Sequence, residues 1–270
     1  MSDEQRARDE MLREAWRRLD EGDAEGALIE ARSLIGGDDA LADAHYLAGS
    51  ALMEMDRLGE AEPYLRRVLD LSDGHAGARE ALAQLLYETC RFRETRSELE
   101  LLLEAEPDNP QAHHLASLLA ERRGEYALAE EEERMAHRFA PELYPLPPRF
   151  TREEFEHYVE EAIESLPGEF RDPMGNLAVV VEDVPSTALL RTLEDPSPGL
   201  LGLFVGTALP EKSLGDVPQA PDAVYLFKRN LERICEDHAE LVEEIRITLL
   251  HEVGHFLGLD EQQLSDRGYE

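Results

Sequence analysis

The sequence predicts two domains, an α-helical repeat solenoid followed by a small α+β domain. Three observations lead to this prediction. Residues of the first half recur with a period of 34, prolines crowd the stretch 141–148, and β-branched runs alternate with helical patterns after it. We therefore predict a repeat domain at residues 8–143, a proline-rich linker at 144–149 and an α+β domain at 150–270.

The period becomes visible when the sequence is shifted against itself by 34 residues. Equivalent residues then align in columns: Ala24, Leu58, Phe92 and Tyr126; Ala27, Ala61, Thr95 and Ala129; and the small Ala15, Gly49, Ala83 and Ser117. Each unit divides into two stretches with apolar residues at helical spacing. In period and pattern the array resembles the tetratricopeptide repeat, with four units. The resemblance implies that the helical pairs stack into a short superhelix.

The resemblance also implies a concave groove that binds a peptide or protein partner. The residues that would face this groove include Trp16, Tyr46, Ser50, Glu80, Gln84, Tyr87, His114 and Glu121. None of them is lysine or arginine, so a clamp for a terminal carboxylate is not expected. We expect an apolar or basic segment as the partner. The alternative is that the array serves as a structural spacer or as a platform for the second domain.

After the prolines, the pattern changes to mixed helices and strands. Thr151 and Glu154 form a capping box that opens a helix, which closes at Leu166 and Pro167. Apolar, β-branched runs predict strands at 176–181, 200–206 and 222–227, although glycines weaken the second prediction. Helices at about 230–235 and 238–257 follow. Helices around a small sheet make an α+β domain.

The last of these helices carries the sequence His251-Glu252-Val253-Gly254-His255. Two histidines four residues apart lie on one helical face, so both imidazoles can reach a single metal ion such as Zn²⁺. Glu252 is placed to take a proton from a metal-bound water. The helix must stop before a third ligand can approach, and Gly258 is suited to end it. The chain can then return with Glu261 or its neighbour Asp260.

At this point residues 150–265 resemble the small bacterial zincin-like metallopeptidases, also called minimal metalloproteases. The resemblance covers the opening helix, the three strand segments and the motif, in the same order. It implies one Zn²⁺ held by His251 and His255, a third acidic ligand at Glu261, and Glu252 as the catalytic glutamate. We favour Glu261 over Asp260 as the ligand and expect Asp260 to face solvent or to orient a histidine. The candidates for an oxyanion donor are Tyr269 and His238.

The composition restricts the partners and the compartment. The net charge is −33, from 60 acidic and 27 basic residues, and both halves are acidic. Nucleic acid and anionic membranes are therefore not expected as partners. Cys90 and Cys235 are too few for a disulfide framework, and the charged N-terminus does not fit a signal peptide. These features together favour a cytoplasmic protein.

Two functions fit these patterns. The first is a zinc-dependent metallopeptidase in which Glu252 moves the proton during peptide hydrolysis and the repeats recruit a substrate or partner. The second is a non-enzymatic adaptor whose zinc ion only stabilises a small domain. A structural zinc site does not require Glu252, so this residue favours the enzyme.

Overall fold

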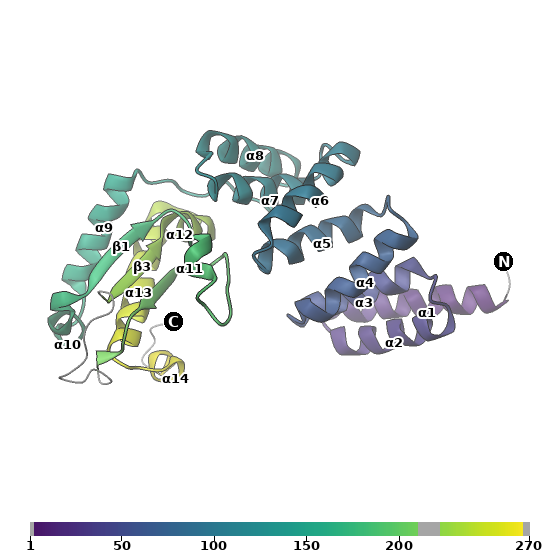
Figure 1. The fold of residues 1–270 in the computed structure, drawn as a ribbon, viewed down its shortest axis with the longest axis horizontal. Coiled ribbons are helices and arrows are strands. Elements are labelled where there is room, and N and C mark those ends of the chain that lie inside the picture. Colours follow the sequence, from purple (N-terminus) through teal and green to yellow (C-terminus); the bar gives the residue numbers. More distant parts are fainter. Residues whose placement is uncertain (1–2, 210–221, 267–270) are drawn as a thin grey trace. The chain divides into compact units, whose positions relative to one another are not determined.

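The computed structural model describes residues 3–209 and 222–266 (Figure 1). The chain divides into two compact units, Met1–Ala140 and Pro141–Glu270. The division lies directly after the last repeat helix, where Pro141 follows Ala140. Each unit is described by itself below.

The first unit consists of paired helices throughout residues 3–139. In chain order these are α1 (Asp3–Asp20), α2 (Ala24–Gly37), α3 (Ala42–Glu54), α4 (Leu58–Leu71), α5 (Ala76–Glu88), α6 (Phe92–Ala105), α7 (Pro110–Glu121) and α8 (Tyr126–Phe139). The first helices of successive pairs contact one another, α1 with α3, α3 with α5 and α5 with α7. This arrangement confirms the predicted helical repeat solenoid.

The repeat position that is always a small residue (Ala15, Gly49, Ala83 and Ser117) lies where the helices cross. Ala15 and Ala83 are fully buried, and Ser117 is buried as well. At Gly49 an added Cβ would lie 2.7 Å from Leu65 Cδ2, which is closer than real Cβ contacts. The column therefore needs small residues because α3 and α4 approach closely at this position.

The turn within each pair also repeats every 34 residues. Gly22, Asp56, Cys90 and Gly124 each have a positive φ, from 55° to 85°. Glycine adopts this conformation freely, whereas other residues adopt it less often. The first and fourth turns were recognisable from their glycines. Asp56 and Cys90 adopt the same left-handed conformation in the second and third units, although the sequence gives a weaker signal there.

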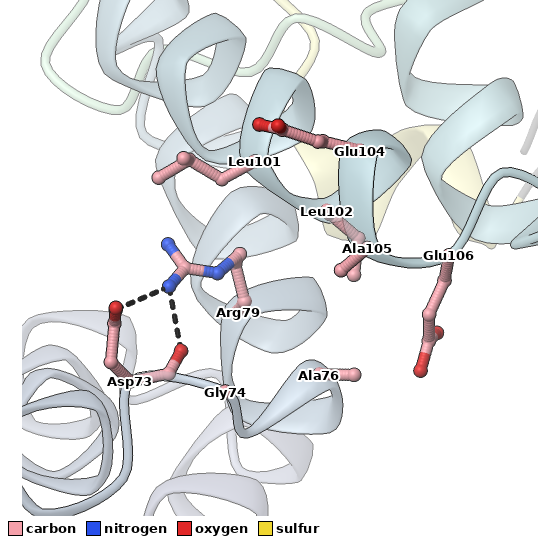
Figure 2. A pocket seen from close by; sticks show the side chains of 9 residues that line it. All are labelled: Asp73, Gly74, Ala76, Arg79, Leu101, Leu102, Glu104, Ala105 and Glu106. Atoms are coloured by element: carbon pink, nitrogen blue, oxygen red, sulfur yellow. Dashed lines mark hydrogen bonds and ion pairs between the residues drawn. The ribbon is translucent and has the colours of Figure 1, made fainter.

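A buried arginine joins the third pair to the turn that precedes it (Figure 2). Arg79 Nη2 donates to the carbonyl of Asp73 at 2.8 Å and to its carboxylate at 2.7 Å. Its Nη1 donates to Glu98 Oε2 on α6 at 2.7 Å. Arg79 thus connects α5, α6 and the α4–α5 turn, beside a surface pocket of about 470 Å³.

The same connection recurs in the fourth unit, and part of it recurs in the second unit. In the fourth unit His113 Nε2 donates to the carbonyl of Pro107 at 2.8 Å, and Nδ1 lies 2.6 Å from Glu132 Oε2. In the second unit His45 Nε2 donates to the carbonyl of Asp39 at 3.1 Å. In the second unit Tyr64 occupies the repeat position that Glu98 and Glu132 occupy in the third and fourth units. Among residues 3–209 and 222–266, His45 Nδ1 therefore has no hydrogen-bond partner.

The second unit combines a three-stranded sheet with helices. Its elements are α9 (Arg152–Ser165), α10 (Gly168–Arg171), η1 (Asp172–Asn176), β1 (Ala178–Glu182), α11 (Thr187–Leu190), β2 (Gly202–Val205), β3 (Ala223–Phe227), α12 (Lys228–Ile234), α13 (His238–Phe256) and α14 (Glu261–Ser265). The strand order is β1-β3-β2, with β1 parallel and β2 antiparallel to β3. The three strands lie where the sequence predicted them, which confirms the α+β class.

Helix α13 is the centre of this unit. It packs on α9 and on strands β2 and β3. Ile245, Leu249 and Val253 on α13 are fully buried in the core that α9 and the sheet complete. The predicted capping box of α9 is present, because Thr151 and Glu154 each bond to the other's main chain. The His251-Glu252-Val253-Gly254-His255 motif therefore lies on a helix that contributes to the core of the unit.

A buried ion pair attaches the start of this unit to α12. Glu232 is fully buried, and its Oε1 accepts hydrogen bonds from Lys228 and from the main chain of Phe150. Its Oε2 accepts from Arg149 Nη1 at 2.8 Å. Burial lowers the pKa of Lys228, which the adjacent Glu232 carboxylate partly offsets. Arg149 and Phe150 are therefore part of the folded unit.

Candidate metal centre

The last two turns of α13 bring His251 and His255 together. Their Nε2 atoms are 3.0 Å apart, and the ring planes are nearly perpendicular at 82°. The apolar residues before the motif bury this end of the helix, whereas both imidazoles remain partly exposed. The two nitrogens therefore face the same accessible space.

Directly after His255 the chain reverses through a left-handed glycine. Gly258 has φ +82°, and its N–H donates to the carbonyl of His255 at 3.0 Å. The N–H of Leu259 donates to the carbonyl of Gly254 at 3.0 Å. These two bonds form the Schellman motif, in which glycine ends a helix. The predicted helix end is thus at Gly258, and α14 lies at this end of α13 (Figure 1).

The reversal places Glu261 beside both histidines. Its Oε2 is 3.5 Å from His251 Nε2, and its Oε1 is 3.2 Å from His255 Nε2. One ligand atom from each of the three residues lies within 4.8 Å of the other two. The side chains are 23%, 28% and 74% exposed in the order His251, His255 and Glu261. The cluster is open to solvent on its Glu261 side.

These separations suit the predicted zinc ion. A tetrahedral Zn²⁺ with ligands at about 2.0–2.2 Å holds its donor atoms roughly 3.3–3.6 Å apart. The two histidine Nε2 atoms are 3.0 Å apart, and each lies 3.2 or 3.5 Å from a different oxygen of Glu261, so each separation is close to that range. Two imidazole nitrogens and one carboxylate are also a donor set that zinc accepts in catalytic sites. The residues present therefore fit one Zn²⁺.

The hydrogen bond at His255 Nδ1 determines which nitrogen faces the cluster. Nδ1 donates to the carbonyl of Leu259 at 3.2 Å. A carbonyl only accepts, so in the neutral ring the proton lies on Nδ1 and the lone pair lies on Nε2. The turn after the helix therefore leaves the lone pair of His255 Nε2 facing the cluster, as a metal ligand would require.

Asp260 is exposed to solvent, one of the two placements expected for it. Its carboxylate accepts from the N–H of Gln263 at 2.9 Å, and Gln263 Oε1 accepts from the N–H of Asp260 at 3.0 Å. This reciprocal pair is the capping box of α14. The oxygen that orients His255 thus comes from the main chain of Leu259, and Asp260 fixes the start of the helix that carries Glu261.

Glu252 is buried, with only 8% of its surface exposed. Its Oε2 accepts a hydrogen bond from the main-chain N–H of Phe204 in β2 at 2.7 Å. Burial raises the pKa of Glu252, whereas the Phe204 hydrogen bond and the nearby histidines act in the opposite direction. The carboxylate is therefore held by the sheet, next to the candidate ligand His251 in the chain.

The close packing of β2 on α13 depends on a glycine. A Cβ at Gly202 would lie 2.7 Å from Thr248 Cγ2 and 2.8 Å from Glu252 Cγ. In the sequence Gly202 indicates only a weakened strand, and no local pattern connects Gly202 or Phe204 with Glu252. A glycine inside a strand also marks a position where another element approaches closely, and that signal was available.

Of the two candidate oxyanion donors, the structure describes His238 alone. His238 begins α13, thirteen residues or about 20 Å before His251 along the helix. Its ring stacks on Phe150 at 4.6 Å, and its Nε2 lies 3.4 Å from the carbonyl of Arg149. Tyr269 lies outside the described residues.

The predicted groove residues of the repeat unit divide into two groups. Tyr87 and Glu121 are buried, 8% and 3% exposed, because neighbouring helices cover them. The others are partly exposed, and Trp16 and Tyr46 form an aromatic pair with ring centroids 5.4 Å apart. His75 extends this pair, 4.7 Å from Tyr46. A partner would therefore meet an aromatic cluster on the first helices.

Comparison with protein families gives two matches, one in each unit. Residues 174–269 match the family described as zincin-like metallopeptidase. Residues 52–119 match the tetratricopeptide repeat. The second unit is thus zincin-like, and the first contains a tetratricopeptide-repeat region. No curated protein matches the chain significantly.

Several solved structures are also similar to this chain. MamA from Desulfovibrio magneticus RS-1 is 18% identical with a TM-score of 0.46, over 64% of this chain and 90% of that one. Pseudomonas aeruginosa pilF is 20% identical with a TM-score of 0.47, over 60% and 68%. YrrB, described as a TPR protein with an unusual peptide-binding site, is 17% identical with a TM-score of 0.33, over 49% and 86%. Across the described residues, no helix has the length and apolar character needed to cross a membrane.

Proposed function

From a zincin-like domain joined to a tetratricopeptide-repeat region, we propose that this protein is a zinc-dependent metallopeptidase whose repeats recruit a peptide or protein. The observation that carries the proposal is the arrangement of four side chains. The donor atoms of His251, His255 and Glu261 lie within 4.8 Å of one another, and the buried Glu252 follows the first ligand in the chain.

In this proposal the side chains have distinct tasks. His251, His255 and Glu261 hold Zn²⁺, which when bound lowers the pKa of water and polarises the peptide carbonyl. Glu252 takes the proton from the water that attacks the scissile carbonyl. It then delivers this proton to the amine that leaves, so one carboxylate acts first as base and then as acid.

The surroundings of Glu252 support this assignment. A surface glutamate has many rotamers, whereas Glu252 is buried and held by the Phe204 N–H at 2.7 Å. Such fixing lowers the entropy that must be lost before proton transfer. The raised pKa of Glu252 also makes its carboxylate a better proton acceptor than an ordinary surface glutamate.

The first test concerns metal and activity together. Full-length protein purified without added metal should contain about one zinc ion per chain by elemental analysis. A peptide library should be cleaved by this protein, and a chelator should stop the cleavage until zinc is restored. Bound zinc without any cleavage would support the adaptor function instead, and absence of zinc would contradict both functions.

For the repeat region, we propose a partner segment that is apolar or basic. The chain has a net charge of −33, and none of the predicted groove residues is lysine or arginine. Trp16 is the single tryptophan and is paired with Tyr46, so its fluorescence reports on this face. Basic peptides should change the fluorescence of the full-length protein at lower concentration than acidic peptides of equal length. Equal responses to both would contradict the proposed charge preference.

A further inference from the structure

Helix α14, which carries Glu261, is attached to the unit mainly through one side chain. Leu264 is fully buried, whereas Glu261, Gln262 and Gln263 are exposed. Leu264 follows Glu261 by three residues, which places it less than one turn further along the helix. The position of Leu264 therefore determines where the main chain of Glu261 lies.

Leu264 packs where Gly254 lacks a side chain. A Cβ built on Gly254 would lie 2.3 Å from Leu264 Cδ2, with Cγ at 3.5 Å and Cδ1 at 3.6 Å. A distance of 2.3 Å is far shorter than any non-bonded contact between carbon atoms, so the Leu264 Cδ2 methyl group occupies the space that a side chain at position 254 would need. Gly254 also accepts the N–H of Leu259 through its carbonyl at 3.0 Å. Gly254, which lies between the two histidines, thus contacts both the turn after α13 and helix α14.

From this contact we propose that Gly254 and Leu264 are positioning residues for Glu261, the third zinc ligand. The proposal rests on the zinc site of the proposed function. Glu261 is 74% exposed and has a long side chain, so its own surroundings restrict it little. The Gly254–Leu264 contact fixes α14 at the distance from which the carboxylate reaches both imidazoles. Without that contact the Glu261 carboxylate is no longer held within reach of the two imidazoles, although His251 and His255 remain on α13.

The test is zinc affinity, measured by competition with a chelator on the full-length protein. Gly254→Ala should weaken zinc binding by about 10–100-fold, the range found for residues that support metal ligands. The same substitution should have little effect when Leu264 is already alanine, because the methyl group that it would meet is gone. A control, Gly59→Ala, adds a Cβ to a helical glycine with nothing within 4 Å and should leave zinc affinity unchanged.

A second pair of variants tests the route through Glu261 and does not require Gly254→Ala to fold. Leu264→Ala should weaken zinc binding in the wild-type background and cause no further loss in the Glu261→Ala background. Thermal unfolding of each metal-free variant monitors the fold independently of zinc. Equal weakening by Gly254→Ala in both Leu264 backgrounds, or by Leu264→Ala in both Glu261 backgrounds, would overturn the proposal.

Unchanged affinity in Gly254→Ala would also overturn the inference while the proposed function remained intact. A wild-type protein that binds no zinc would instead defeat the proposed function, and this inference with it. The two failures are therefore distinguishable in the same titration series.

Discussion

The main-chain N–H of Phe204 donates a hydrogen bond to Glu252 Oε2 at 2.7 Å, which links strand β2 to the middle of the metal motif. Strand and helix approach closely enough for this bond because Gly202 has no side chain. In the sheet order β1-β3-β2, strand β2 is at one edge. The carboxylate proposed as the base is thus positioned by an edge strand, and the proposed metal ligands are carried by α13 and α14.

We predict that Glu252→Gln keeps zinc bound and lowers peptide cleavage by at least about 100-fold, the usual contribution of general acid–base catalysis. Glutamine still offers an oxygen to the Phe204 N–H, so the local packing should persist. Zinc content and cleavage rate are measured on the same preparation. A glutamine variant that cleaves as fast as a metal-dependent wild type would show that Glu252 does not transfer the proton.

We predict that Gly202→Ala also lowers cleavage while zinc remains bound. The added methyl would lie within 3.0 Å of atoms of Thr248 and Glu252, so the strand or the glutamate must shift. Overpacking of this kind typically costs about 1–3 kcal/mol of stability. A displacement of about 1 Å in a catalytic group lowers rates by up to about 100-fold. Wild-type cleavage by this variant would show that the position of Glu252 tolerates the shift.

We predict that Glu261→Ala weakens zinc binding far more than Asp260→Ala does. Glu261 lies 3.2 Å from His255 Nε2, whereas the Asp260 carboxylate accepts from the Gln263 N–H. Asp260→Ala should lose a helix cap worth about 1 kcal/mol, and Asp260→Asn should restore it. Chelator competition decides between the two residues. Loss of zinc by Asp260→Ala with wild-type affinity in Glu261→Ala would reverse the assignment.

We predict that Arg79→Ala destabilises the repeat unit by about 1–3 kcal/mol, because it removes buried charge-assisted hydrogen bonds. The lost partners are the Asp73 carbonyl and the Glu98 carboxylate. Arg66→Ala is the matched control, since its ion pairs are exposed and should contribute less than about 1 kcal/mol. Urea unfolding followed by helical circular dichroism compares them. Equal losses in the two variants would show that the buried position of Arg79 adds nothing.

We predict that the two units fold separately and that limited proteolysis cuts first between residues 143 and 148. Leu143 is 74% exposed and Leu146 is 47% exposed, whereas Arg149 is already attached to Glu232. Thermolysin, which cuts before leucine, should release two resistant fragments, and replacing both leucines by aspartate should slow the release. Disappearance of the whole chain without a stable fragment would contradict separate folding.

The elements that could be predicted from the sequence are those whose signals are local. The 34-residue period required stacked helical pairs, because one pair cannot bury its apolar face alone. The spacing of His251 and His255 required a shared helical face, and Gly258 indicated where that helix ends. The capping box at Thr151 and Glu154 and the three strand segments were also readable, since they depend on neighbours in the chain.

The contacts that join distant parts of the chain could be identified only in the folded structure. Glu252 and Phe204 are 48 residues apart, and no local pattern pairs a glutamate with a main-chain N–H of a strand. Likewise, Gly202 and Gly254 look like ordinary weak points of a strand and a helix, until packing shows which atoms occupy their missing side chains. A residue's own type predicts its main-chain preference, whereas its role in the site depends on which atoms the fold brings against it.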